Sequence, residues 1–280
     1  MDFPEGTFTL GGDLTVRRLG FGAMRITGRG IWGPPANEAE AIRVLRRAVE
    51  LGVNLIDTAD SYGPEISEQL IAKALHPYPA GFVIATKGGL TRPGPDRWVS
   101  NCSPAHLKQA CEGSLKRLKL ERIDLYQLHT HDSRVPLEDS IGALAELRAA
   151  GKIRHIGVSN FSVPELKRAQ KIAPIVSAQN MYNMGDRKSD PVVDRCEAEG
   201  LGFLPWYPLA VGSLSRGGSR IDAIAKHHHA TPSQIALAWL LKRSPVMLPI
   251  PGTSSAAHLE ENVTAAKIQL SDEEFHSLAR

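Results

Sequence analysis

Short β-rich segments alternate with helical segments along almost the whole chain, and this alternation limits the possible folds more than any other feature. After a predicted hairpin (residues 8–10 and 15–17), we expect strands near residues 20–24, 54–58, 83–86, 123–128, 155–159, 176–180, 202–206 and 246–250. Helices are expected near 37–51, 65–75, 104–118, 137–149, 163–171, 189–199, 231–242 and 255–264. Such units imply parallel strands with right-handed crossovers. Eight of them predict an α/β fold, a closed (β/α)₈ barrel, as one domain over residues 1–280.

The ends of the predicted helices carry residues that suit helix termini. Three helix starts have the spacing of a capping box: Asn37 with Glu40, Ser162 with Glu165, and Thr231 with Gln234. Glycines follow three of the helices, where a left-handed residue is favoured: Gly52, Gly151 and Gly200. These signals support the predicted boundaries.

An open, doubly wound sheet is the alternative architecture, and its usual marker is a glycine-rich loop before the first helix. The segment Gly28-Arg-Gly30-Ile-Trp-Gly33 has that spacing. Pro34 and Pro35 follow it, and the helix is expected only near Asn37, so the glycines do not present a helix N-terminus to a pyrophosphate. We therefore interpret the segment as a loop.

Charge and cysteine content exclude several classes of function. A formal net charge of +3 is too small to indicate nucleic acid or a membrane surface as the main partner. The three cysteines, Cys102, Cys111 and Cys196, are sparse and fit a reducing compartment. No apolar run is long enough to span a bilayer, and residues 1–10 do not resemble a signal peptide. We expect a cytoplasmic protein.

Polar and aromatic side chains gather where the predicted strands end. The active sites of such barrels lie at the C-terminal ends of the strands. The residues that this rule selects are Asp57, Tyr62, Lys87, His129, Ser159, Asn160, Gln179 and Trp206. An acid, a phenol, an ammonium group and an imidazole are therefore expected at one mouth.

The first four types suggest proton transfer to an oxygen that gains negative charge. A lysine cation is expected to lower the pKa of Tyr62, an aspartate to keep that lysine charged, and a neutral histidine to donate a hydrogen bond to a carbonyl. Each residue also has a structural alternative: Asp57 and Lys87 as an ion pair, Tyr62 as a loop aromatic, and His129 as a strand-end residue. Their joint placement favours function.

Seven stretches of the sequence resemble the aldo-keto reductase family. They are GVNLIDTADSYG (52–63), VIATKGG (83–89), ERIDLYQLHTHD (121–132), GKIRHIGVSNF (151–161), AQNMYN (178–183), PWYPLA (205–210) and PIPGTSSAAHLEEN (249–262). The resemblance implies a barrel closed at its bottom by an N-terminal hairpin. It also implies hydride transfer from NADPH to an aldehyde or ketone, with Asp57, Tyr62, Lys87 and His129 as the catalytic tetrad. Tyr62 would be the acid.

The resemblance also assigns residues to the cofactor. Ser159, Asn160 and Gln179 would contact the nicotinamide carboxamide, and Trp206 would stack on its ring. The other cofactor positions are Leu209, Gly252, Thr253, Ser254, His258, Glu261 and Asn262. Many members have a lysine near the position of Gly252 and an arginine at the position of His258, and that pair binds the 2′-phosphate; here one charge is absent and the other is weaker. An ordinary helix cap is the alternative for this segment, and NADH is the alternative to NADPH.

The expected substrate is a small carbonyl compound. Trp32 and Trp98 lie in predicted loops rich in glycine and proline, and they are expected to form an apolar pocket wall, with surface packing as the alternative. The segments around residues 7–35 and 250–262 resemble bacterial pyridoxal reductases of the family, and pyridoxal is one candidate. The chain also resembles the aryl-alcohol-dehydrogenase-like branch.

Three further expectations concern partners, metal and role. We expect a monomer or a weak homo-oligomer. No metal site is expected at His227-His228-His229, because consecutive helical residues do not face one ion. The alternative to an enzyme is a cofactor-binding regulatory subunit of the same fold.

Overall fold

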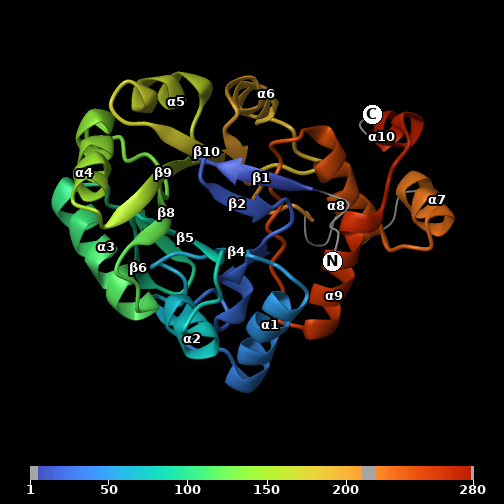
Figure 1. The fold of residues 1–280 in the computed structure, drawn as a ribbon, viewed down its shortest axis with the longest axis horizontal. Coiled ribbons are helices and arrows are strands. Elements are labelled where there is room, and N and C mark those ends of the chain that lie inside the picture. The colour runs from blue at the N-terminus through green and yellow to red at the C-terminus, as the bar shows by residue number, and fades with distance from the viewer. Residues whose placement is uncertain (1–5, 210–218, 279–280) are drawn as a thin grey trace.

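Seven parallel strands form one curled sheet at the centre of the molecule (Figure 1). The computed structural model describes residues 6–209 and 219–278. The strand order is β11-β10-β9-β8-β5-β4-β3. In chain order the strands are β3 (Phe21–Gly22), β4 (Leu55–Asp57), β5 (Val83–Gly88), β8 (Ile123–Leu128), β9 (Ile153–Ser159), β10 (Ile175–Gln179) and β11 (Gly202–Phe203). The predicted α/β barrel is confirmed, while its description as one domain over residues 1–280 stays a prediction.

The eighth predicted strand, residues 246–250, is not a regular strand. It is extended chain that contacts both edges of the sheet. On one side the Phe203 N–H donates to Val246 O at 2.9 Å and the Leu248 N–H to Phe203 O at 2.8 Å. On the other side, the N–H groups of β3 and the residue before it donate to Pro249 O and Pro251 O. Prolines at 249 and 251 have no N–H to return, so the ladder is interrupted. This closing segment (residues 246–251) nevertheless completes the barrel.

Eight helices cover the outside of the sheet (Figure 1). They are α1 (Glu38–Glu50), α2 (Ile66–Leu75), α3 (Pro104–Leu118), α4 (Leu137–Ala149), α5 (Val163–Gln170), α6 (Asp190–Glu199), α8 (Pro232–Arg243) and α9 (Ala256–Thr264). All eight lie at the predicted places. The capping boxes at Ser162 and Thr231 are both formed. At α1 the Asn37 side chain accepts from the Glu40 N–H at 3.0 Å, and the box is not reciprocated.

The N-terminal hairpin closes the end of the barrel opposite the C-terminal strand ends. It consists of β1 (Thr7–Leu10) and β2 (Leu14–Arg17). Its buried residues Leu10, Leu14 and Val16 form one apolar cluster with inward residues of the sheet. At the turn, the His155 ring lies against Gly11 and bonds Asp13 through Nε2 at 2.6 Å. The hairpin therefore seals the barrel interior at its lower end.

Several elements were not predicted. A second hairpin, β6 (Leu90–Gly94) and β7 (Arg97–Ser100), occupies a segment that was expected to be a loop because it is rich in glycine and proline. Asp96 supplies a left-handed turn residue there, with φ 53°. Short helices α7 (Ser219–His227) and α10 (Asp272–Leu278) pack against each other, and 3₁₀ turns η1 (Ala23–Ile26) and η3 (Ala265–Lys267) follow β3 and α9.

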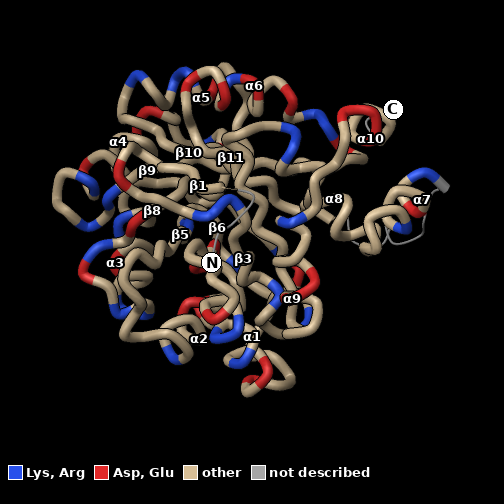
Figure 2. Tube along the Cα trace, turned by 45° about the vertical axis from the view of Figure 1, so that its right-hand side comes forward, with Lys and Arg blue, Asp and Glu red and all other residues tan. Residues whose placement is uncertain are grey.

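Charged residues of both signs alternate along the outer helices (Figure 2). Among the described residues, no helix is long and apolar enough to cross a membrane. Two sequence expectations reach beyond the described residues: the comparison with a signal peptide used residues 1–5, and the stretch 205–210 ends at Ala210.

Candidate active site

An ion pair between Lys87 and Asp57 lies at the C-terminal end of the barrel interior. Lys87 Nζ is 2.5 Å from Asp57 Oδ1, 2.9 Å from the carbonyl oxygen of Thr58 and 3.4 Å from Tyr62 Oη. Lys87 is completely buried, and Asp57 is 3% exposed. A buried charge is tolerated when it is paired and hydrogen-bonded, and here the ammonium group has three oxygen partners.

The strands and one loop position the four predicted side chains. Asp57 is the last residue of β4, Lys87 lies near the end of β5, and His129 follows β8 directly. Tyr62 lies in the loop between β4 and α2, where its carbonyl accepts from the Ser67 N–H at 3.1 Å. Gly63 comes next with φ 100°, a backbone conformation that favours glycine. The loop thus turns the phenol back towards Lys87.

The direction of the Tyr62 pKa differs from the sequence expectation. Burial raises the pKa of the Tyr62 phenol, and the Lys87 ammonium only partly opposes this effect. For Lys87, burial disfavours the charged form, but the Asp57 carboxylate and the Tyr62 oxygen outweigh it, and the pKa is raised. Tyr62 is therefore a protonated phenol at neutral pH, and Lys87 is a cation beside it.

His129 is a neutral imidazole close to the phenol. Burial, together with the Lys87 charge, holds its pKa well below the usual range. Nδ1 lies 3.4 Å from Ser61 Oγ. The ring contacts the edges of two aromatic rings, with centroids 5.9 Å from Tyr62 and 6.4 Å from Trp98. A neutral imidazole in this place can donate a hydrogen bond to an oxygen near Tyr62 Oη.

Two glutamines complete the surroundings of Asp57, and sequence reasoning missed one of them. Gln179 Nε2 and Gln127 Nε2 donate to Asp57 Oδ2 at 2.8 and 3.0 Å. The missed residue, Gln127, is completely buried and lies one residue before the end of β8. An amide in a buried strand requires a hydrogen-bond partner, and that requirement is the signal that points to it.

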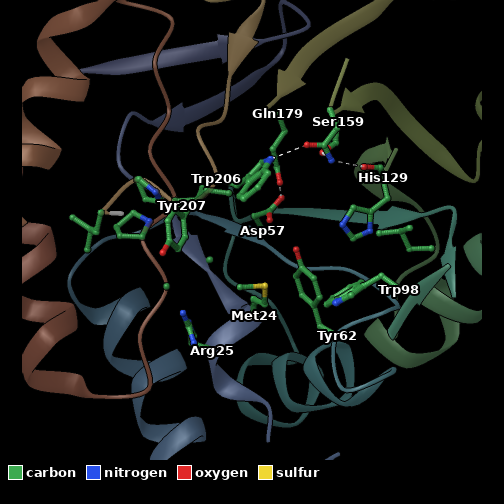
Figure 3. Close-up of a pocket in the computed structure, with 18 residues that line it drawn as sticks. Met24, Arg25, Asp57, Tyr62, Trp98, His129, Ser159, Gln179, Trp206 and Tyr207 are labelled. Carbon is green, nitrogen blue, oxygen red and sulfur yellow. Dashed lines mark hydrogen bonds between the residues drawn. The ribbon is translucent and has the colours of Figure 1, made fainter. Parts of the chain in front are cut away.

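A cavity of about 410 Å³ opens above these residues. Its size is in the range of small-molecule sites. Figure 3 shows Tyr62, Trp98 and His129 together on one side of it and Arg25 on the other. The other lining residues are Gly22, Met24, Asp57, Leu90, Ser159, Asn160, Gln179, Trp206, Tyr207, Pro208, Leu209, Ile250, Pro251 and Gly252.

Asn160 connects two walls of the cavity. Its Oδ1 accepts from Trp206 Nε1 at 3.0 Å, and its Nδ2 donates to the carbonyl oxygen of His129 at 3.1 Å and to Ser159 Oγ at 3.2 Å. Its backbone is left-handed, with φ 60°, a conformation that asparagine tolerates better than most residues. The Trp206 indole is thereby fixed at the edge of the cavity.

Trp98 lines the cavity, whereas Trp32 is not among the lining residues. Trp98 lies on β7, with its ring centroid 6.4 Å from that of Tyr62. The Arg92 guanidinium lies over both indole rings, 3.7 Å from the centroid of Trp98 and 5.7 Å from that of Trp32. Trp32 itself pairs with Gly63 in a β-bridge. Of the two predicted wall residues, the structure places one at the cavity.

The residues expected around the adenosine phosphates lie on and before α9. Of these, only Gly252 lines the cavity. The buried Thr253 accepts from the Ser255 N–H at 3.1 Å, and Glu261 accepts from the Thr231 hydroxyl at 2.5 Å. His258 and Ser254 are exposed, and Asn262 is buried. The first N–H of α9, at Ala256, donates to Glu40 Oε1 at 3.3 Å.

No metal site was expected at the three consecutive histidines, because consecutive residues of a helix do not face one ion, and the structure does not support this reasoning. The helix α7 ends at His227, so His228 lies beyond it, and both rings turn to one carboxylate. His227 Nδ1 and His228 Nε2 each lie 3.0 Å from Glu274 Oε1. Among the described residues, these three form the one group with possible metal ligands within 4.8 Å of one another. The absence of a metal stays a prediction.

Comparison with known proteins gives one family. The model described as "Aldo/keto reductase family" matches residues 18–280. An uncharacterized oxidoreductase of Schizosaccharomyces pombe is 51% identical over 267 residues, which are 95% of this chain and 87% of that protein. The pyridoxine 4-dehydrogenase of Escherichia coli is 44% identical over 280 residues, covering 98% of this chain and 97% of that protein.

A solved structure agrees in fold and contains a cofactor. The aldo-keto reductase of Klebsiella pneumoniae in complex with NADPH superposes with a TM-score of 0.84 at 27% identity, over 98% of this chain and 93% of that chain. The expectations of family and barrel fold drawn from the sequence are therefore confirmed.

Proposed function

This chain belongs to the aldo/keto reductase family, and from that premise we propose that it is an NADPH-dependent oxidoreductase that reduces the carbonyl of a small aromatic aldehyde. The observation that carries the proposal is the 3.4 Å approach of Lys87 Nζ to Tyr62 Oη at the wall of the cavity. In reverse, the same site oxidises the corresponding alcohol. Pyridoxal is the first substrate candidate, because the E. coli relative is named a pyridoxine 4-dehydrogenase.

Tyr62 acts as the general acid in this proposal. Its raised pKa keeps the phenol protonated at neutral pH, so the hydrogen needed by the carbonyl oxygen is present. As Tyr62 gives up that proton, the Lys87 ammonium stabilises the phenolate across 3.4 Å. Asp57 holds the ammonium in place at 2.5 Å. The cofactor, when bound, supplies a hydride to the carbonyl carbon.

His129 orients the carbonyl oxygen. Its lowered pKa leaves a neutral ring that donates one hydrogen bond without competing for the proton of Tyr62. Its ring contact with Tyr62, at 5.9 Å between centroids, brings both groups within reach of one oxygen. Two directed donors on a single oxygen favour the developing negative charge over the neutral carbonyl.

The cavity has groups that suit a nicotinamide cofactor. Ser159, Asn160 and Gln179 bring a hydroxyl and two amides to one wall, and these groups match the donors and acceptor of a carboxamide. The Trp206 indole beside them offers a face for offset stacking. Since Asn160 already bonds Trp206 and the His129 carbonyl, it would share these bonds with the carboxamide. NADPH is proposed on the precedent of the K. pneumoniae relative, and NADH is the competitor.

The opposite wall suits a flat, partly apolar substrate. Trp98 and Leu90 enter the cavity from the second hairpin, and Met24 faces them from η1. An aldehyde on an aromatic ring would stack between these side chains with its oxygen at Tyr62 and His129. We further propose a monomer or weak homo-oligomer that works in the cytoplasm, with residues 1–280 as one domain.

The test uses Tyr62→Phe, which removes only the hydroxyl. The purified protein is assayed for NADPH oxidation with pyridoxal, benzaldehyde and aliphatic aldehydes, and cofactor binding is followed by tryptophan fluorescence. General acids contribute roughly 10²- to 10⁴-fold to rate, so kcat should fall by that factor while the Kd for NADPH stays within about twofold. Unchanged turnover in the variant would refute the assignment of the acid, and binding without turnover in the unmodified protein would favour a regulatory role.

A further inference from the structure

Two histidines and one glutamate come together where the end of α7 and the turn after it meet α10. His227 Nδ1 and His228 Nε2 each lie 3.0 Å from Glu274 Oε1, and one ligand atom of each residue lies within 4.8 Å of the other two. The centroids of the two rings are 4.9 Å apart. None of the three residues lines the cavity, and the proposed reaction does not use them. Two imidazoles and a carboxylate are a ligand set that zinc sites use.

The Glu274 carboxylate is held in position by its own helix. Oε2 accepts from the Ser271 N–H at 2.8 Å, and the Glu274 N–H donates to Ser271 Oγ at 3.1 Å. This reciprocal pair is a capping box, and it leaves Oε1 facing the two histidines. Burial raises the pKa of the Glu274 carboxyl, but hydrogen bonds from Ser271 and the histidines outweigh it and bring the pKa to about 2. The group is therefore an anion at neutral pH.

Contacts with the core fix the backbone on both sides of this cluster. On α10, the Phe275 ring stacks on Trp239 of α8 with centroids 5.3 Å apart, and its carbonyl oxygen accepts from Trp239 Nε1 at 3.3 Å. On the other side, the His228 N–H donates to the carbonyl oxygen of Ile224, which belongs to the buried core. The His227 side chain is 74% exposed, so water reaches the cluster. Ligands that are supported in this way form a defined site.

The spacing of the three atoms suits a small divalent ion. Tetrahedral zinc, with bonds of about 2.0–2.2 Å, places neighbouring ligand atoms roughly 3.3 Å apart. The two ring nitrogens lie 3.0 Å from Glu274 Oε1, so each has to move by only roughly 0.3 Å to reach that spacing. Each neutral ring must also carry its proton on the other nitrogen, because a ligand atom presents a lone pair to the metal.

We propose that His227, His228 and Glu274 bind a divalent transition-metal ion, Zn²⁺, with water as the fourth ligand, and that the ion joins α7 to α10. The proposal reverses the expectation of no metal at the histidine triplet, which assumed that the rings project from one helix. His228 lies instead in the turn that follows α7. Zinc is favoured over magnesium and calcium, because imidazole nitrogen suits zinc whereas those two ions prefer oxygen ligands.

Zinc binding by the untagged, chelator-treated protein tests the inference without turnover. The Kd and the stoichiometry for Zn²⁺ are measured by calorimetry near neutral pH on the unmodified protein and on His227→Gln, His228→Gln and Glu274→Gln. Glu274→Gln keeps an oxygen for the Ser271 N–H, so it removes the charge and preserves the helix cap. His229→Asn is the matched control, because His229 is exposed and outside the cluster, and asparagine tolerates its φ of 50°.

We expect one Zn²⁺ per chain. Replacement of any one ligand should weaken binding by at least roughly 10- to 100-fold, because loss of even an outer-shell partner of a metal has an effect of that size. His229→Asn should bind as the unmodified protein does, and excess Mg²⁺ should not compete. Free Zn²⁺ at 100 times the Kd should raise the Tm by roughly 5 °C, because the ion binds the folded chain.

The inference is overturned if the unmodified protein does not bind Zn²⁺ at one ion per chain, or if His228→Gln and Glu274→Gln bind it as tightly as His229→Asn does. Circular dichroism and the Tm without metal show whether each variant is folded, and three separate ligand variants keep the test decisive if one of them is not. The outcome is independent of the proposed function, because the cluster lies outside the cavity.

Discussion

Removing the Lys87 side chain provides a quantitative test of the buried pair. In Lys87→Met the methionine fills a similar volume, but the Asp57 carboxylate stays buried, 3% exposed, with only its two glutamine donors. Breaking a buried ion pair by removing one partner costs about 3–5 kcal/mol of unfolding free energy. Because two hydrogen bonds to Asp57 remain, we expect the lower end, about 3 kcal/mol.

The double variant Lys87→Met/Asp57→Asn separates the unpaired charge from lost packing. An asparagine oxygen at the place of Oδ2 still accepts from Gln127 and Gln179, and no buried charge is left. We expect the double variant to recover at least about half of the loss, so that the two substitutions are strongly non-additive. Unfolding in urea is followed by tryptophan fluorescence and far-UV circular dichroism, and a lack of coincidence between the two probes would reveal an intermediate. A double variant that is no more stable than Lys87→Met would refute this account, because removing the unpaired charge would then have recovered none of the lost free energy of unfolding.

Two further predictions concern the proton donor and the substrate wall. Because the pKa of His129 is lowered and that of Tyr62 is raised, kcat/KM for aldehyde reduction should not change between about pH 6.5, where an ordinary histidine titrates, and about pH 9, where an ordinary tyrosine begins to titrate. A change in kcat/KM near pH 6.5 that disappears in His129→Gln would contradict this prediction. Arg92 donates to four backbone carbonyls and stacks on Trp98 at 3.7 Å. Arg92→Gln should therefore release Trp98 and lower kcat/KM for aromatic aldehydes roughly 10-fold, with the Kd for NADPH unchanged. Equal losses for aromatic and short aliphatic aldehydes would contradict the assignment of Trp98 to the substrate wall of the cavity.

The sequence predicted the helices and the inner strands well because both carry strong local patterns. β8 is a continuous buried run, apart from the half-buried Asp124, and capping residues mark α5 and α8. The closing segment was wrong as a strand because its apolar run hides two prolines that cannot donate to a neighbour. The hairpin of β6 and β7 was missed because its glycine and proline content resembles that of a loop. The hydrogen bonds from Arg92 that join it to residues 30, 31 and 61 are long-range contacts, which only the folded chain makes.

The candidate site likewise contains residues that a local rule predicts and properties that only the folded chain determines. Asp57, Lys87 and His129 were found because the strand-end rule depends only on where a strand stops. Applied to the first strand as well, that rule selects Arg25. The net direction of the Tyr62 pKa could not be predicted, since it depends on how deeply the phenol is buried relative to its distance from Lys87, and no local pattern contains either quantity.

The proline-containing closing segment makes the barrel wall uneven around its circumference. Between β8 and β9 the registered pairs extend over most of both strands, whereas residues 246–251 are joined to each neighbour by only a few bonds. Regions with fewer backbone bonds open at lower free energy than the rest of a fold. That weaker seam borders the cavity through Ile250, Pro251 and Gly252. A ligand that contacts both Gly252 and Arg25 would bridge the two sides of the seam. Its binding would therefore stabilise the closed form of the barrel relative to forms in which the seam has opened.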